Sequence, residues 1–345
     1  MLTSPRPSTV PRHHRLARLA ALPALTAIAL GMVHAPVASA QPAAVWAVST
    51  TIDVGTTPTQ FAFSPDATRL YVTAGDGFDV IDTATNTAID KVSVPTVGGI
   101  AVTPDGAIYV LGIDGTVSVI DPVTYATIAS VDVGTNTLGM TASGDAVYVT
   151  NHGNETVEVI DTTTNAVDAT VPVGQNPIQA TALDGTVYVT NAGSGTVSAI
   201  DAATNTVIAT ISVGGVPIGV TSAAGRVYVV EGVSQSVAVI DGTSNTVVET
   251  IPVGGGSLTG IAATADGSTV LVNQSDTDTV AIIDLDDPTA RQSVTVGARP
   301  GGAIAAPDNT TAYIANGAAA SISVLTTADA GCTGIACIPT GSFGG

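Results

Sequence analysis

Short apolar runs rich in Val, Ile and Ala recur along the chain, separated by clusters of Gly, Asp, Asn and Ser. In the stretch that begins at Gln175, such runs cover residues 178–183, 186–191, 196–201 and 206–213. Runs of β-branched residues bounded by turn formers are typical of strands. The pattern therefore predicts four short strands joined by tight turns, and no stretch after residue 40 has the spacing of an amphipathic helix.

Three sequence words repeat in a fixed order. Val-Gly closes successive units at Gly134, Gly174, Gly214 and Gly254, a step of 40 residues each time. A Tyr-Val word and an Ile-Asp word accompany it in most units. Four strands in each repeat of this length predict an all-β propeller, in which each repeat forms one four-stranded antiparallel blade.

The number of repeats indicates how the ring closes. Six complete units are followed by a seventh, residues 298–329, which supplies only three strands. The segment from Val45 to Gly55 has the pattern of a fourth strand, with no first three before it. We therefore expect a seven-bladed β-propeller whose N-terminal strand completes the last blade. Closing the ring in this way removes sheet edges that would otherwise invite aggregation.

The N-terminal segment differs from the rest of the chain. It carries four arginines and no acidic residue, then an apolar run over residues 19–33 and an Ala-x-Ala site ending at Ala40. This order is typical of a secretory signal peptide, and the run is shorter than the ~20 residues that a membrane span needs. We expect a secreted or extracytoplasmic protein, in the periplasm or at the cell surface, without an integral membrane span. The expected domains are a signal peptide (1–40), the propeller (41–329) and a short C-terminal tail (330–345).

Removal of the signal peptide leaves a strongly acidic chain. Four of the nine basic residues lie in residues 1–40, so five remain against 28 acidic residues, a net charge of −23. Binding nucleic acid requires several Lys or Arg side chains that neutralise phosphates. Five scattered basic residues exclude that class, and they disfavour anionic membrane surfaces. We expect a monomeric ring whose partner is a protein or a cell-envelope component.

Both cysteines of the chain, Cys332 and Cys337, lie in the C-terminal tail. In an exported protein, two cysteines this close in sequence most simply form a disulfide. Their spacing is not that of a Cys-x-x-Cys motif, and no histidine stands near them to complete a metal site.

The repeated words also carry a family resemblance. Tyr148-Val-Thr-Asn151 and Tyr188-Val-Thr-Asn191, with the Ile-Asp-x-x-x-Asn turn, resemble the 40-residue YVTN-type β-propeller repeat proteins. The resemblance covers nearly the whole chain after residue 40. It implies an exported propeller similar to surface-layer or surface-antigen components. The same ring also resembles seven-bladed lactonases and lyases, which are enzymes.

Candidate chemistry lies on the loops that enter the first strand of a unit or join its second and third strands. His152, the only histidine after the signal peptide, shares one such loop with Glu155, a residue type that could orient it as a general base. The competing interpretation is a solvated loop on an acidic surface. Candidate binding residues on the other loops are Asp76, Glu231 and Arg299.

The chain has few residues that could bind a metal or a redox cofactor. Haem or copper sites would need several His, Cys or Met ligands, which the chain lacks. Calcium binds oxygen ligands, and loop carboxylates at short spacing make weak candidates for it. They are Asp276, Asp278, Asp284 and Asp286.

The sequence thus favours an exported propeller that acts as a non-catalytic binding scaffold at or outside the cell envelope. It provides no convergent catalytic set, and we expect no bound cofactor. The alternative is a metal-assisted lactonase or lyase with its site on the central face of the propeller, where His152 would be the base and Glu155 its orienter or a metal ligand.

Overall fold

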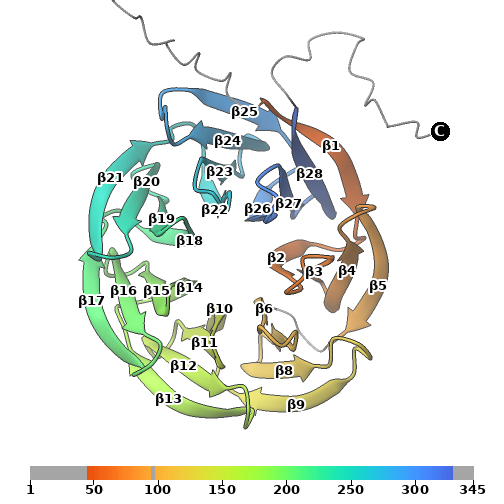
Figure 1. Ribbon diagram of the computed structural model, residues 1–345, viewed down its shortest axis with the longest axis vertical. Helices are drawn as coiled ribbons and strands as arrows, with labels where there is room; N and C mark the ends of the chain where they lie inside the picture. Colours follow the sequence, from red (N-terminus) through yellow and green to blue (C-terminus); the bar gives the residue numbers. More distant parts are fainter. Residues whose placement is uncertain (1–44, 95–97, 329–345) are drawn as a thin grey trace, which may run out of the picture. The chain divides into compact units, whose positions relative to one another are not determined.

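Apolar strand words and polar turn words fold into one kind of unit, repeated around a ring. In the computed structural model, which describes residues 45–94 and 98–328, every regular element is a β-strand. The strands form seven antiparallel sheets of four, arranged as the blades of a propeller (Figure 1). The predicted fold is confirmed. Over these residues, no helix is long and apolar enough to cross a membrane.

The innermost strands, from blade 1 to blade 7, are β2 (Pro58–Phe63), β6 (Ile100–Val102), β10 (Thr137–Ser143), β14 (Pro177–Leu183), β18 (Pro217–Ala223), β22 (Leu258–Ala263) and β26 (Pro300–Ala305). The second strands are β3 (Arg69–Ala74), β7 (Ile108–Leu111), β11 (Ala146–Asn151), β15 (Thr186–Asn191), β19 (Arg226–Glu231), β23 (Thr269–Gln274) and β27 (Thr311–Asn316). The third strands are β4 (Gly77–Asp82), β8 (Thr116–Ile120), β12 (Thr156–Asp161), β16 (Thr196–Asp201), β20 (Ser236–Asp241), β24 (Thr279–Asp284) and β28 (Ser321–Ala328). The outermost strands are β5 (Thr87–Ser93), β9 (Thr127–Asp132), β13 (Ala166–Pro172), β17 (Thr206–Ser212), β21 (Thr246–Pro252), β25 (Arg291–Thr295) and, in blade 7, β1 (Val45–Asp53).

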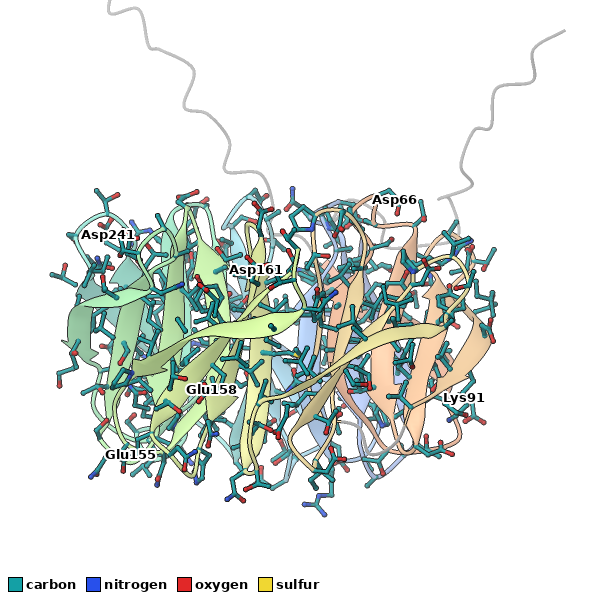
Figure 2. All side chains as sticks on the ribbon, turned by 90° about the horizontal axis from the view of Figure 1, so that it is seen from below. Asp66, Lys91, Glu155, Glu158, Asp161 and Asp241 are labelled. Carbon is teal, nitrogen blue, oxygen red and sulfur yellow. The ribbon has the colours of Figure 1, made fainter. Side chains whose placement is uncertain are left out.

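The ring has two faces with different loops. The crossover face carries the connections from one blade to the next and the loops between second and third strands. The terminal face carries the turns between first and second strands and, in blades 1 to 6, those between third and fourth strands. Val45 and Ala328, which bound the described ring, pair with each other at the same face. Figure 2 shows Asp66, Asp161 and Asp241 at the terminal face, and Glu155 and Lys91 at the opposite one.

The ring closes through the N-terminal strand, as predicted. β1 pairs antiparallel with β28 from Val45↔Ala328 to Asp53↔Ser321, with a register shift between Val48 and Thr50. β28 extends to Ala328, because β1 supplies a partner over its whole length. Trp46 is buried between blades 6 and 7. The backbone N–H of Trp46 donates a hydrogen bond to the side-chain oxygen of Gln292 in β25 (2.9 Å).

The tyrosine of the repeated word joins neighbouring blades. Tyr148 donates a hydrogen bond to the side-chain oxygen of Asn205 in the next blade (2.9 Å), and Tyr313 reaches Asn86 across the closure (2.8 Å). Tyr109 and Tyr188 make the same contact. Each acceptor asparagine has a positive φ, a conformation that asparagine tolerates better than most residues. The Tyr-Val and Asp-x-x-x-Asn words are therefore two halves of one inter-blade contact.

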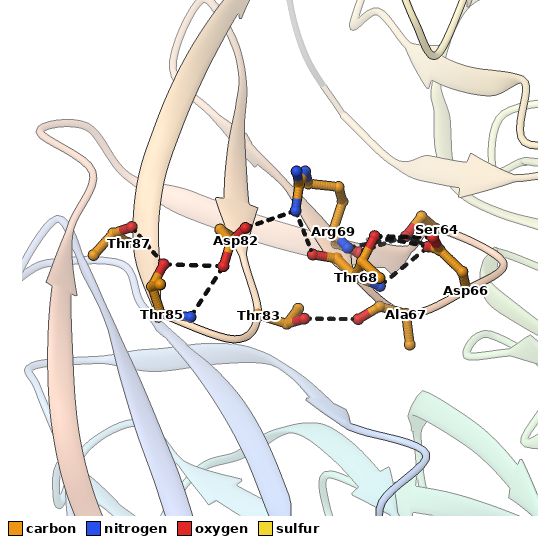
Figure 3. Close-up of polar contacts among 9 residues, drawn as sticks. All are labelled: Ser64, Asp66, Ala67, Thr68, Arg69, Asp82, Thr83, Thr85 and Thr87. Carbon is orange, nitrogen blue, oxygen red and sulfur yellow. Dashed lines mark hydrogen bonds and ion pairs between the residues drawn. The ribbon is translucent and has the colours of Figure 1, made fainter.

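In blades 1 to 6, an aspartate at or directly after the end of the third strand organises the turn that follows. In blade 1, Asp82 accepts hydrogen bonds from the backbone N–H and the hydroxyl of Thr85 (both 3.0 Å), and Arg69 pairs with its other oxygen at 2.7 Å (Figure 3). The bond from the Thr85 backbone contributes most to lowering the pKa of the Asp82 carboxyl. Asp161 has the same turn, and the Thr164 backbone lowers its pKa in the same way. Much of the acidity of the terminal face thus serves its turns.

The inter-blade contact leads to a stability prediction. Tyr148→Phe removes the hydroxyl and leaves the Asn205 oxygen without its donor, so we expect a loss of about 0.5–1.5 kcal/mol in the free energy of unfolding. Tyr228→Phe is the matched control, because Tyr228 is equally buried and its hydroxyl makes no hydrogen bond within residues 45–94 and 98–328. Urea unfolding of both variants checks this. Equal losses would contradict the assigned role of the hydroxyl.

Candidate functional site

A β-bulge in the innermost strands shapes the entrance to the central channel. Six of the seven innermost strands shift register near the crossover face, for example between Pro58 and Phe61 in β2 and between Pro177 and Ala180 in β14. A bulge leaves residues without a ladder partner and re-aims their side chains. Residues of these bulges lie side by side around the entrance in five blades, and they are Thr59, Gln60, Ile178, Gln179, Ile218, Thr259, Gly260, Gly301 and Gly302.

These residues line a cavity of about 710 Å³ on the crossover face. A narrower channel of about 320 Å³ is lined by all seven innermost strands. Gln60 and Gln179 line both spaces. We call the larger cavity the mouth. Its volume falls within the range of sites for small-molecule ligands.

The threonine of the repeated word supports the bulges. Thr150 accepts a hydrogen bond from the Gly139 N–H in the bulge of its own blade (2.9 Å) and donates one to the Ile178 carbonyl of the next blade (2.9 Å). Thr190 accepts in the same way from Gln179 N–H (3.1 Å). A buried N–H that a bulge frees from the ladder needs such a partner. The word that signals the repeat therefore also fixes the backbone that lines the mouth.

Of the three predicted binding residues, Arg299 is the one that lines the mouth. It lies on the crossover loop into β26 with a φ of 53°, and its backbone N–H donates to the Asp278 carboxylate (2.8 Å). Its guanidinium forms no ion pair or hydrogen bond with the described part of the chain. One other basic side chain in the described part of the chain, that of Arg226 on the terminal face, also forms no ion pair and no hydrogen bond.

The other two predicted binding residues lie away from the mouth lining. Asp76 is exposed and stands 3.7 Å from the Lys91 ammonium. Glu231 is buried at the end of β19, where it accepts hydrogen bonds from the hydroxyls of Ser234 and Ser236 in its own blade. It occupies the place of the motif asparagine of other blades, and its contacts bind its own loop.

His152 and Glu155 share the loop between β11 and β12, as predicted, and neither lines the mouth. The His152 Nδ1 is buried without a hydrogen-bond partner among the described residues, and its backbone N–H donates to Asn136 (2.9 Å). Glu155 is exposed, with a φ of 59°. No hydrogen bond joins the two side chains in the described ranges. Their assignment as a general base and its orienter stays a prediction.

The calcium candidates fall into two pairs at opposite ends of β24. Asp276 and Asp278 lie on the crossover face, whereas Asp284 and Asp286 lie on the terminal face, ~17 Å away along the strand. The Asp276 carboxylate accepts the Ser257 N–H (2.7 Å). Within residues 45–94 and 98–328, no three or more His, Cys, Asp or Glu side chains are grouped so that they could hold a metal ion. Cys332 and Cys337 lie outside these residues.

Sequence reasoning missed most of the mouth. Gln60, Gln179, Thr259 and Gly301 were not among the predicted site residues, because they lie inside strands and not on loops. A usable signal was present. Proline opens four of the innermost strands, at Pro58, Pro177, Pro217 and Pro300, and the residues after it are those that the bulge turns toward the channel.

Comparisons with known proteins support the fold. No family model and no curated protein sequence matches this chain. A solved structure of Kuenenia stuttgartiensis hydrazine synthase is similar, with a TM-score of 0.72 and 20% sequence identity over 81% of this chain and 99% of that one. At this sequence identity, the similarity shows a shared propeller fold and gives no information about activity.

A buried carboxylate near the crossover face leads to a prediction about pH. Burial raises the pKa of the Asp79 carboxyl, and the Lys91 ammonium, 4.0 Å away, opposes this. The folded chain therefore holds this proton more tightly than the unfolded chain, so ionisation of Asp79 lowers stability. Asp79→Asn should raise the free energy of unfolding at pH 7. The gain should shrink as the pH falls through the raised pKa and vanish by about pH 3.

Urea unfolding between pH 7 and pH 4 measures this difference. Asp76→Asn is the control, because its carboxyl is largely exposed and its loss should change stability little. A gain for Asp79→Asn that stays constant on acidification would contradict the assigned cause.

Proposed function

We propose that this chain is an exported, YVTN-type β-propeller that acts as a non-catalytic binding scaffold at or outside the cell envelope. It holds a protein or a cell-envelope component at the mouth of its central channel. The signal-peptide pattern of residues 1–40 supports export, and the excess of acidic residues argues against nucleic acid as the partner.

One observation carries the binding role. The contacts that hold the blades together repeat around the ring, whereas the bulge residues that line the mouth differ between blades. Ile178 and Ile218 lie in two blades, Thr259 in a third, and a pair of glycines in blade 7. Packing between blades accounts for the contacts that repeat. An asymmetric ligand accounts for the differences between blades in the residues that line the mouth. Open space, varied polar groups and an unpaired guanidinium fit recognition.

The test is capture of partners from envelope extract by the purified protein. Gly301→Leu should abolish capture, because a Cβ at Gly301, which lines the mouth, would meet no atom within 4 Å, so that a leucine there can fill part of the mouth. Val123→Phe adds similar bulk at an exposed site on the terminal face and should leave capture unchanged. Capture that survives Gly301→Leu would contradict a binding site at the mouth.

The competing lactonase or lyase function is tested by turnover of lactones and esters with calcium and other divalent metals. The scaffold proposal expects no turnover above that of His152→Ala, and capture that does not depend on calcium. Metal-dependent turnover that is lost in His152→Ala would contradict it. Such a result would assign His152 and Glu155 to catalysis.

A further inference from the structure

We infer that the mouth binds the C-terminal end of a polypeptide chain, with its free carboxylate at Arg299 and an apolar last side chain on Ile178 and Ile218. This inference rests on the proposed binding function and adds the chemical group that is recognised. Three features of the mouth support it: an apolar side, a cationic side and a floor of amide side chains.

The apolar side comes from two adjacent blades. Ile178 in β14 and Ile218 in β18 occupy the same bulge position, directly after a proline, and both are only partly buried although they line the cavity. An apolar ligand group that covers this aliphatic surface removes it from water. This stabilises the complex by about 25 cal/mol per Å² of apolar surface buried. A leucine-like or valine-like side chain suits this side.

The cationic side lies at the loop that enters blade 7, where Arg299 contacts Asp278 of blade 6 and Gly317 of blade 7. Arg299 lines the mouth there beside Thr57 and Thr59, and its guanidinium has no partner within residues 45–94 and 98–328. A guanidinium binds a carboxylate through two parallel hydrogen bonds. At physiological ionic strength, charges more than about 8 Å away are largely screened. Most of the negative charge of the ring is therefore screened at Arg299. The nearby acid that competes with a ligand carboxylate is Asp278, whose carboxylate accepts the Arg299 backbone N–H (2.8 Å).

The floor between the two sides carries amides. The side chains of Gln60 and Gln179 line the mouth and the channel below it, and neither makes a side-chain hydrogen bond with the described part of the chain. Each offers an acceptor oxygen and two donor hydrogens. Peptide N–H and C=O groups match these, whereas a fatty acid would cover them without hydrogen bonds. The floor thus favours a peptide end over a simple amphiphilic acid.

Calorimetric titration of the purified protein tests the inference with three probes. They are acetyl-Gly-Ala-Ala-Leu with a free carboxylate, the same peptide with an amidated C-terminus, and octanoate. We expect the free-acid peptide to bind at least tenfold more tightly than the amide and than octanoate. Equal binding of the acid and the amide would overturn the inference. So would octanoate binding as tight as the peptide, or no binding by any probe.

Matched variants locate the contact. Arg299→Gln should remove the preference for the free acid, whereas Arg226→Gln, which loses an equally unpaired charge on the terminal face, should keep it. Gly301→Leu should weaken both peptides at least tenfold with an unchanged melting temperature. Loss of the preference in Arg226→Gln as well would show a general charge effect and overturn the assignment to Arg299.

The peptide titration tests the inferred ligand, and the extract capture tests the proposed function, so each can fail without the other. If the peptides do not bind but Gly301→Leu still abolishes capture from extract, the mouth is a binding site and the inferred ligand is wrong. If neither the peptides nor any extract component depend on the mouth, the proposed function fails as well.

Discussion

Pairing of β1 with β28 is the constraint on which the rest of the structure depends. The two strands are 275 or more residues apart in the chain at several of their contacts, such as Ser49 with Val324. Without this pairing, the seven blades would form an open stack with free edges on both sides. The mouth would also lose its form, because Arg299 and Gln60 come from the two blades that meet at the closure, blades 7 and 1. Tyr313 and Asn86 join the same two blades, so the closure is held by side chains as well as by the sheet.

The repeat separates the residues that build the ring from those that line its centre. Tyr148 and Asn205 join adjacent blades, and Thr150 satisfies the N–H that the bulge frees. With the backbone fixed by these contacts, the bulge residues can change without loss of the fold. Blade 4 presents Ile178 and blade 7 presents Gly301 in the same strand position. A scaffold of equivalent blades thus carries a lining that is different on each side, which a ligand with two unlike ends requires.

The sequence predicted the strands closely and the site only in part. In blade 4, β15 and β16 have the predicted bounds, because polar turns interrupt apolar runs at each end. The closure could be predicted because a missing turn leaves a gap in a strict period. The bulges could not, since a register shift depends on contacts between strands and adds no turn residue. Arg299 was found because it lies on a loop. Gln179 was missed because it lies within a strand. Glu231 accepts hydrogen bonds from serines of its own loop, and its role in binding stays a prediction.

The central claim is that recognition takes place at the mouth, on side chains that the bulges turn inward. Isoleucine-methyl NMR of the purified protein, titrated with acetyl-Gly-Ala-Ala-Leu, tests it most directly. The methyl groups of Ile178 and Ile218 line the mouth, whereas Ile89 and Ile208 are exposed on outermost strands. We predict saturable shifts of Ile178 and Ile218 and none of Ile89 and Ile208. Peptide binding that shifts only the outer strands, or that leaves Ile178 and Ile218 unshifted, would contradict the account.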